Sequence, residues 1–237
     1  MNPNRPPAPY SGVENLEVMR EAVNYNRYLL HMIRYHAAGA KRFIDFGAGS
    51  GTFAVPCTEL GIDVTAVEPD HRLRALLRDY GVRVVADAVE LPDSRFDYAY
   101  SLNVLEHIDD DVGALRTLRA KLVPGGRLFI YVPAFPSLYT SMDKKVGHVR
   151  RYTLATLRAS VAGAGFEIER AYYADALGFV ATLLFKTLDN GSGEVNRRLL
   201  RIYDRFVFPV SRALDSLTRR WFGKNAILIA TNPAASR

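Results

Sequence analysis

Three glycines at every second position, Gly47, Gly49 and Gly51, form the part of the chain best suited to hold a ligand. They follow a short apolar run that ends at Asp45, and a segment able to form a helix comes after them. Glycine is required where the backbone takes a positive φ or comes within contact distance of a ligand. The N–H groups at the start of the following helix have no intrahelical partner. The spacing predicts a strand, a tight turn and a helix, with a ligand against the turn; a simple tight connection is the alternative.

Two kinds of nucleotide site use a glycine-rich turn, and the spacing separates them. A dinucleotide fold has the pattern G-x-G-x-x-G, which would place its third glycine at position 52, where this chain has Thr52. The pattern G-x-G-x-G, with an acidic residue two positions before the first glycine, resembles that of the class I S-adenosylmethionine (SAM)-dependent methyltransferases. Later motifs resemble the bacterial branch of this family that acts on small molecules or lipids.

The resemblance implies an α/β fold with a Rossmann-like, seven-stranded, mostly parallel sheet and helices on both faces. It also implies SAM as the cofactor, with the Asp45 carboxylate near its amino and sulfonium cations. One domain is expected over residues 1–237. Its parts would be an N-terminal helical cap (13–38), a cofactor-binding core (42–175), a helical insertion (176–224) and a last strand (225–231).

Further cofactor residues are expected where other strands end. Glu68 lies 17 positions beyond Gly51 and can accept hydrogen bonds from both ribose hydroxyls of an adenosine group. In the family, Asp87 and Ala88 would lie at the adenine, and Asn103 with its neighbours would face the cofactor. A solvated strand end or an exposed turn is the plainer interpretation of Glu68 and Asp87. The predicted cofactor residues are Asp45, Gly47, Ala48, Gly49, Gly51, Glu68, Pro69, Asp87, Ala88, Asn103, Val104 and Tyr28.

Candidate catalytic residues lie in two motifs that resemble segments of the family, LNVLEHI after the fourth predicted strand and GHVRRY after the fifth. His148 could take a proton from the methyl acceptor while Arg150 or Arg151 holds an acidic substrate group. His107 is a second candidate base, and Tyr152 is a candidate orienting group. Alternatively, the arginines tie the loop to backbone carbonyls and His107 makes a structural hydrogen bond.

Three consecutive acidic residues, Asp109–Asp111, have the composition of a metal site. They directly precede a helical pattern at 112–122. Acidic side chains in the first turn of a helix cap its N–H groups and complement its dipole. We interpret them as a helix cap, and no metal is predicted.

Hydrophobic periodicity predicts the elements that position these residues. Helices are expected at 13–36, 52–60, 72–80, 112–122, 153–162 and 176–188. Strands are expected at 62–67, 82–86, 96–101, 127–132, 166–172 and 226–230, besides the one before the glycine turn. A long loop, 133–152, would lie at the ligand-binding edge of the sheet, and residues 1–12 would be extended or disordered. In the family, the N-terminal helix lies across the mouth of the cofactor cleft, which makes Tyr10, Tyr25, Asn26 and Tyr28 candidate ligand contacts. A helix packed on the edge of the sheet is the plainer interpretation.

The positive charge of the chain is concentrated in one late segment. Residues 186–224 contain nine basic and four acidic residues, a net charge of +5 out of +6 for the chain. The same segment has a long amphipathic helical pattern, 194–222, interrupted at Pro209, with Leu199 and Phe206 on an apolar face. Such a helix could contact an anionic membrane or receive a lipid-like acceptor. It could equally be a lid packed over the active site.

The location of the protein is predicted from three features. The single cysteine, Cys57, cannot form an internal disulfide. The first ten residues lack an apolar signal segment. The longest apolar run, 176–185, is shorter than the roughly 20 residues needed to span a bilayer. We expect a cytoplasmic protein, peripheral to the inner face of the membrane if 194–222 contacts it.

Together these patterns predict SAM-dependent methyl transfer to a hydroxyl of a small-molecule or lipid-like acceptor, with an amine or carboxyl acceptor as the alternative. An NAD-dependent oxidoreductase is a rival, against which stand the missing third glycine and the lack of a Tyr-x-x-x-Lys pair after the fourth strand. A SAM-binding module without catalysis is a second rival. Nucleic acid is not expected as a partner because no basic patch is interleaved with aromatic residues. The oligomeric state is not predicted.

Overall fold

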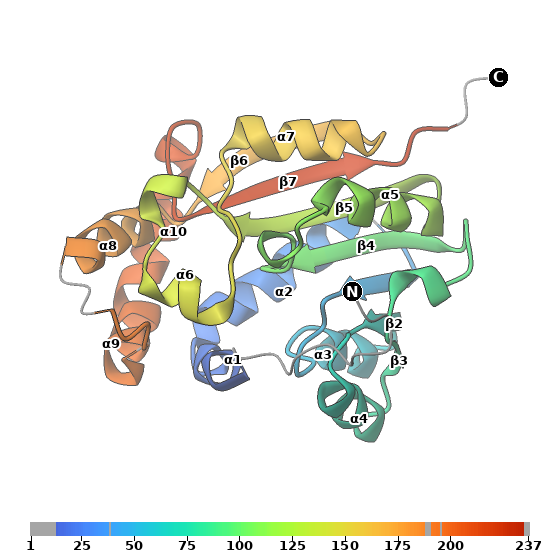
Figure 1. Ribbon diagram of the computed structural model, residues 1–237, viewed down its shortest axis with the longest axis horizontal. Coiled ribbons are helices and arrows are strands. Elements are labelled where there is room, and N and C mark those ends of the chain that lie inside the picture. Colours follow the sequence, from blue (N-terminus) through green and yellow to red (C-terminus); the bar gives the residue numbers. More distant parts are fainter. Residues whose placement is uncertain (1–12, 38, 188–190, 195, 235–237) are drawn as a thin grey trace, which may run out of the picture.

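The computed structural model describes residues 13–37, 39–187, 191–194 and 196–234, so the segment 1–12, including Tyr10, lies outside the described residues. Its centre is a seven-stranded sheet in the order β3-β2-β1-β4-β5-β7-β6 (Figure 1). Strands β1 to β5 pair in parallel, and β7 is antiparallel to β5 and β6. This confirms the predicted Rossmann-like sheet. The strands are β1 Arg42–Phe46, β2 Asp63–Val67, β3 Arg83–Val85, β4 Phe96–Leu102, β5 Leu122–Pro133, β6 Glu167–Ala174 and β7 Asn225–Thr231.

Helices cover both faces of the sheet, as predicted. One face packs against α2 (Val23–Ala37), α3 (Ala54–Glu59) and Leu77 of α4 (His71–Asp79), and the other against α5 (Asp111–Lys121) and α7 (Leu154–Gly163). Successive residues of a strand point to opposite faces. Because both faces are covered, the central strands are apolar at nearly every position.

The candidate site lies where the order of the strands reverses. The chain runs outward from β1 to β3 and then returns to β4 on the other side of β1. Strands β1 and β4 pair in register, with Asp45 opposite Tyr100. The turn after β1 and the segment after β4 therefore leave the same edge of the sheet side by side, which is where parallel α/β sheets bind ligands.

Most predicted boundaries agree with the structure to within two residues. Asp70 and Thr153 cap the N-termini of α4 and α7, and in the acidic cluster Asp110 accepts a hydrogen bond from the N–H of Gly113. Strand β5 differs, because it already pairs with β4 at Leu122 before its register shifts. The Pro-Gly-Gly sequence at 124–126 therefore lies inside β5, at the irregularity where the register shifts.

The segment predicted as a long loop after β5 contains two short helices. These are η3 (Pro136–Leu138) and α6 (Ser141–Val146). Thr140 and Asp143 form a reciprocal capping box at the start of α6, and Gly147 ends this helix in the left-handed conformation. The segment is thus folded against itself before it reaches His148.

The N-terminal helical segment is broken, although its pattern predicts one helix. α1 (Val13–Arg20) ends at Arg20, and α2 begins at Val23. Ala22, directly before α2, has no side-chain oxygen that could cap this helix. The carboxylate of Asp204, 180 positions beyond Asn24, accepts hydrogen bonds from the backbone N–H groups of Asn24 (2.9 Å) and Tyr25 (2.8 Å). The cap that stabilises this break comes from a distant segment, so local periodicity could not reveal it.

The predicted helical insertion lies at one end of the sheet (Figure 1). It contains α8 (Ala176–Thr187), α9 (Arg197–Ile202), a π turn (Tyr203–Val207) and α10 (Phe208–Thr218). The last three form one continuous helical run, so the predicted interruption at Pro209 is wrong. Proline lacks an N–H group and crowds the carbonyl four residues earlier. The wider π turn directly before it accommodates both effects.

In the described part of the chain, no helix combines the length and the apolar character needed to cross a membrane.

We expect Asp204→Ala to lower the free energy of unfolding by about 1–3 kcal/mol, because two N–H groups of α2 lose their acceptor. Urea denaturation followed by circular dichroism measures this change. Arg205→Ala, at an exposed neighbouring position, is the matched control and should change stability by less than about 0.5 kcal/mol. Equal effects of the two substitutions would contradict the capping role.

Candidate functional site

The glycine turn after β1 has the backbone geometry that the sequence predicts. Gly47, Gly49 and Gly51 have φ values of +81°, +55° and +85°. A Cβ atom at position 47 would overlap the side chain of Val104, and one at position 51 would lie 2.8 Å from a side-chain atom of Leu77. Glycine is therefore required at both positions by packing as well as by conformation.

Asp45 lies at the end of β1 with only 3% of its surface exposed, and its Oδ2 atom has no hydrogen-bond partner. Burial, with the nearby charge of Glu68 as a smaller contribution, raises the pKa of Asp45 to about 7. A neighbouring cation favours the ionised form of a buried carboxyl group. The unpartnered oxygen thus fits a ligand that brings a positive charge to the glycine turn.

Glu68 is buried at the end of β2 and binds two backbone N–H groups. Its Oε2 accepts from Gly49 (2.8 Å) and its Oε1 from Asp70 (2.9 Å). Burial nevertheless raises the pKa of Glu68. The carboxylate connects the glycine turn to β2, and each oxygen retains a second acceptor position for a ligand hydroxyl. The neighbouring Pro69 is exposed, and its carbonyl accepts from Arg74 (2.6 Å).

The N–H groups of Gly47 and Ala48 are also used within the protein. Both donate to the carbonyl of Val67, at 2.9 and 3.2 Å. A ligand at this turn would therefore meet glycine carbon atoms and the Asp45 carboxylate rather than a nest of unpaired N–H groups. This arrangement differs from a phosphate-binding turn, in which the backbone N–H groups face the ligand.

Asp87 and Ala88 follow β3 but make the contacts of a cap and a core residue. Asp87 accepts from the N–H of Val89 (2.9 Å) and caps the short helix η1 (Ala88–Glu90). The side chain of Ala88 is buried in the hydrophobic core on the α5 side of the sheet. Their predicted role at an adenine stays a prediction, and the described contacts match the plainer interpretation of an ordered turn.

Asn103 turns the chain sharply after β4. Its φ is +54°, a left-handed conformation that asparagine tolerates better than most residues. Its N–H donates to the carbonyl of Tyr131 (2.8 Å), and its side chain is exposed. This turn brings Val104 against Gly47. The structure therefore unites two predicted cofactor segments that lie more than fifty positions apart.

Two tyrosines of α2 have different surroundings. Tyr25 interacts with Asn103 and meets the ring of Tyr131 edge-on, with centroids 6.1 Å apart, and burial raises its pKa to about 12. Tyr28 instead faces α10, where the guanidinium of Arg212 lies 4.4 Å from its ring centroid. Tyr25 thus contacts the Asn103 turn after β4, whereas the ring contacts of Tyr28 are with the insertion.

His148 is held by one buried carboxylate. Its Nδ1 lies 2.6 Å from Oδ1 of Asp143, which also binds the Arg151 guanidinium at 2.8 and 2.9 Å and the N–H of Thr140 at 2.8 Å. Although burial opposes it, hydrogen bonds from His148 and Arg151 lower the pKa of Asp143. An ionised Asp143 favours the proton on Nδ1 of His148 and leaves a lone pair on Nε2.

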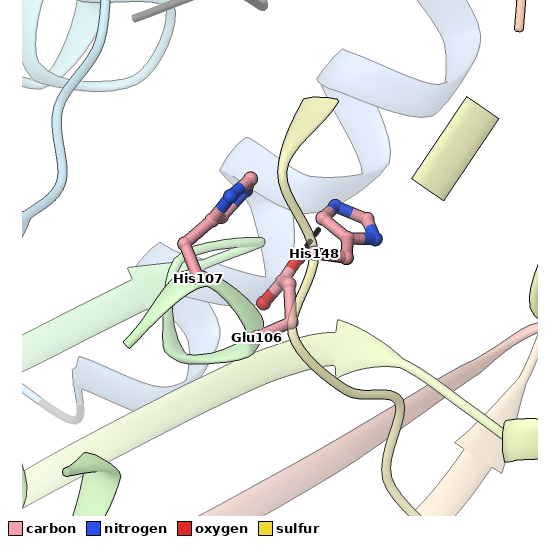
Figure 2. Close-up of side chains that lie close together, drawn as sticks. All are labelled: Glu106, His107 and His148. Atoms are coloured by element: carbon pink, nitrogen blue, oxygen red, sulfur yellow. Dashed lines mark ion pairs between the residues drawn. The ribbon is translucent and has the colours of Figure 1, made fainter. Parts of the chain in front are cut away.

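That nitrogen faces Glu106 of η2 (Leu105–His107), the turn after β4 (Figure 2). Nε2 of His148 is 3.7 Å from Oε1 of Glu106, and the rings of His107 and His148 meet edge-on with centroids 4.7 Å apart. Glu106 is completely buried, and neither of its carboxylate oxygens has a hydrogen-bond partner. Burial raises the pKa of Glu106 to about 8 and lowers that of His107 to about 4.

The same three side chains could hold a metal ion. One ligand atom each from Glu106, His107 and His148 lies within 4.8 Å of the others. Two nitrogens and one carboxylate oxygen suit divalent transition metals. Donors around one ion at about 2.1 Å are at most about 4.2 Å apart. The side chains would therefore have to approach one another to bind a metal.

Tyr152 and Arg150 connect the loop to the body of the domain. The hydroxyl of Tyr152, a core residue, is 2.7 Å from Oδ2 of Asp111. Arg150 donates to the carbonyl of Asp109 (2.8 Å) and pairs with Asp111 (3.3 Å). Tyr152 is buried and its hydroxyl contacts Asp111, and its orienting role stays a prediction. The contacts of Arg150 match the alternative in which the arginines tie the loop to carbonyls.

Two carboxylates of the site, Glu106 and Asp143, are absent from the predicted site residues. Asp143 lies five positions before His148, but its hydrogen bond depends on how α6 folds back. Glu106 meets His148 across 42 positions of chain. For Glu106, the only signal in the local sequence is an acidic residue directly before a histidine in the triplet Leu-Glu-His.

The comparisons with known proteins agree with this geometry. The family described as methyltransferase domain matches residues 19–171, more than half of the chain. A ubiquinone biosynthesis O-methyltransferase of Xanthomonas euvesicatoria is 35% identical over 108 residues, covering 41% of this chain and 44% of the relative. The enzyme of the same name from Xanthomonas campestris is 30% identical over 158 residues, covering 55% and 65%. The chain thus matches less than two thirds of either relative.

Solved structures resemble the fold. A SAM-dependent methyltransferase from Archaeoglobus fulgidus is 20% identical with a TM-score of 0.56, and the match covers 87% of this chain and 94% of that one. Phosphoethanolamine N-methyltransferase 2 of Haemonchus contortus, solved with SAM, is 19% identical with a TM-score of 0.58, covering 90% and 53%. At these identities the likeness shows the fold alone.

The raised pKa of Glu106 predicts a pH-dependent stability. The native state holds the Glu106 proton more tightly than the unfolded state, so this contribution is complete below pH 4.5 and is lost as the pH rises towards 8. Glu106→Gln cannot lose a proton. The difference in free energy of unfolding, Glu106→Gln minus the unsubstituted protein, should therefore increase by roughly 2–5 kcal/mol between pH 4.5 and pH 8.

Urea denaturation at a series of pH values measures this difference. Glu59→Gln, an exposed substitution on α3, is the matched control and should show no such trend. A difference for Glu106→Gln that stays constant across the range would contradict a neutral, buried Glu106.

Proposed function

The chain belongs to the methyltransferase domain family and has the fold of the class I SAM-dependent enzymes, and we propose that it transfers a methyl group from SAM to a hydroxyl of a small-molecule or lipid-like acceptor. The family match covers residues 19–171, which include the glycine turn and His148. SAM is the proposed cofactor, and the acceptor site is proposed beside His148.

The observation that carries the proposal is the buried carboxylate of Asp45, with one unpartnered oxygen beside the glycine turn. SAM presents an amino group and a sulfonium, and either cation would favour the ionised form of Asp45. A nicotinamide dinucleotide would instead bring a pyrophosphate to a turn in which the N–H groups of Gly47, Ala48, Gly49 and Gly51 are already used. Asp45, Glu68 and Asn103 are therefore proposed to hold SAM.

When bound, SAM supplies an electrophilic methyl group. The residues of this chain have to place the acceptor oxygen, exclude water and remove a proton. His148 is the proposed base because Asp143 holds its Nδ1 and leaves Nε2 to accept. The ionised Asp143 would stabilise the imidazolium that results, as the aspartate of a Ser-His-Asp triad does. His107, with its lowered pKa, is a second neutral imidazole at the same place.

A hydroxyl acceptor is supported by the two histidines as candidate bases and by the relatives named O-methyltransferase. A lipid-like acceptor is supported by the insertion, which packs on the segment that carries His148. Lys186 Nζ donates to the carbonyl of Ser137 (2.7 Å), and the N–H of Gly193 donates to Oγ of Ser141 (3.1 Å). We propose a cytoplasmic location with peripheral membrane contact through 194–222.

Substituting Glu68 tests the cofactor. Glu68→Ala should weaken SAM binding by about 1–3 kcal/mol, roughly 5- to 150-fold in Kd, because it strands polar groups of the turn and the ligand. Glu68→Gln keeps one acceptor oxygen and should lose less. Isothermal titration with SAM, and in parallel with NADH, measures both.

Glu59→Ala, an exposed control, should leave the affinity for SAM unchanged. Unaltered SAM binding by Glu68→Ala would remove Glu68 from the site. Tight binding of NADH with no binding of SAM would replace the proposal with an oxidoreductase.

Substituting His148 tests the proposed base. His148→Ala should lower the rate of methyl transfer by about 10²- to 10⁴-fold while SAM affinity stays the same, because proton removal is lost and the cofactor site is not. Transfer from labelled SAM to a cell extract, followed by separation into organic and aqueous phases, measures the rate and shows whether the product is lipid-like.

His31→Ala, an exposed histidine of α2, is the matched control. A protein that binds SAM but labels nothing would support a non-catalytic module. A rate that His148→Ala leaves unchanged would exclude His148 as the base.

A further inference from the structure

The helical run from α9 to α10 carries its large apolar side chains on the outside. They recur every three or four positions along the run, and Trp221 continues the row past its end. Phe206 is 63% exposed and Trp221 is 68% exposed. The apolar row consists of Leu199, Ile202, Phe206, Val210, Leu214, Leu217 and Trp221.

The inward face of the same run is largely polar, which explains this orientation. Asp204 caps α2. Ser211 and Tyr203 donate to the buried carboxylate of Asp175, at 2.8 and 2.5 Å. Asp215 accepts from the N–H groups at the start of α8, the first being that of Asp175 at 2.9 Å. These hydrogen bonds determine which side of the helix faces the domain, and they leave the apolar row in solvent.

The sequence pattern placed Leu199 and Phe206 on one apolar face with Tyr203 and Val207, and the structure divides this group. Tyr203 and Val207 are half-buried, whereas Leu199 and Phe206 are exposed. Periodicity identified an amphipathic helix but left open whether its apolar side packs against the domain or faces outward.

Helix α8 enlarges the exposed apolar surface. It packs beside α10, and both lie at the same end of the sheet (Figure 1). Single exposed apolar residues are common on proteins, but a contiguous group marks an interaction surface. The exposed apolar residues of α8 are Val180, Leu183, Leu184 and Phe185.

Positive charge accompanies this surface. Residues 186–224 carry a net charge of +5, and Asp204, one of their four acidic residues, is buried. Arg198 and Arg205 are exposed beside the apolar row. Apolar side chains next to arginines match the interface of an anionic bilayer, where lipid headgroups meet acyl chains. A second copy of the chain would bring the same positive charge and be repelled.

We propose that the apolar row of α9 and α10, with the exposed side chains of α8, inserts into the interfacial region of an anionic lipid membrane. The inference rests on the proposed function in one respect: a lipid-like methyl acceptor would be found in the membrane that this surface contacts. The same helices contact α2 through Asp204 and the His148 segment through Lys186. Membrane contact would therefore place the acceptor side of the site at the lipid surface.

The single tryptophan reports directly on insertion. Trp221 lies at the end of the row and is the only tryptophan of the chain. Its emission in the full-length protein should shift to shorter wavelength with vesicles of phosphatidylcholine containing phosphatidylglycerol, and not with phosphatidylcholine alone. Cosedimentation with the same vesicles gives the bound fraction, which should fall as salt is added.

Two pairs of substitutions separate the apolar and the charged contributions. Ile202→Gln with Phe206→Gln should weaken vesicle binding at least tenfold. Arg198→Gln with Arg205→Gln should weaken it about 25-fold, from roughly fivefold for each arginine. The replaced side chains are exposed, so circular dichroism and SAM affinity should not change.

Matched controls lie elsewhere on the surface. Leu60→Gln with Val89→Gln removes exposed apolar residues, and Arg95→Gln with Arg158→Gln removes the same charge. Neither should affect vesicle binding.

Three results would overturn the proposal. The first is that the unsubstituted protein does not bind the anionic vesicles. The second is that Ile202→Gln with Phe206→Gln binds them as well as the control variants do. The third is a dimer, detected by light scattering, that Ile202→Gln with Phe206→Gln disrupts; this result would assign the surface to a second copy of the chain. Vesicle binding needs neither SAM nor an acceptor, so its failure is distinguishable from a failure of methyl transfer.

Discussion

The burial of carboxyl groups at one edge of the sheet is the constraint on which the site depends. A buried carboxylate is costly unless hydrogen bonds or a cation compensate for lost hydration. Glu68 meets two backbone N–H groups, and Asp143 meets an arginine and a histidine. Asp45 and Glu106 retain unpartnered oxygens, and burial raises the pKa of both. In the proposed function, Asp45 would meet the charged ligand, and Glu106 lies beside the proposed base.

The satisfied carboxylates have a different task, which is to position the others. Glu68 connects the glycine turn to β2 and thereby holds the backbone next to Asp45. Asp143 orients the imidazole of His148 towards Glu106. Since each of these contacts joins two segments of the chain, the geometry of the site follows from the packing of the sheet edge and not from any one motif.

Polar contacts also decide the surface of the insertion. Asp204, Ser211 and Asp215 all point to the domain because each satisfies polar groups at the start of α2 or α8. Hydrogen-bonding groups that are buried must be paired, whereas apolar side chains tolerate exposure at a smaller cost. The insertion therefore turns its polar side inward, which gives this end of the molecule an apolar exterior.

The amino-acid sequence by itself determined the strand, turn and helix around Gly47, the order of the elements and the family. Positive φ values, caps and periodicity are local properties, so residues close in sequence suffice to reveal them. Tertiary structure alone decided that Tyr152 is a core residue, that Asp204 divides the N-terminal helix, that Asp143 holds His148 and that Phe206 faces outward. Each of these depends on a partner, or on the lack of one, far along the chain. Hydrogen-bond pairing and burial arise only when distant segments meet.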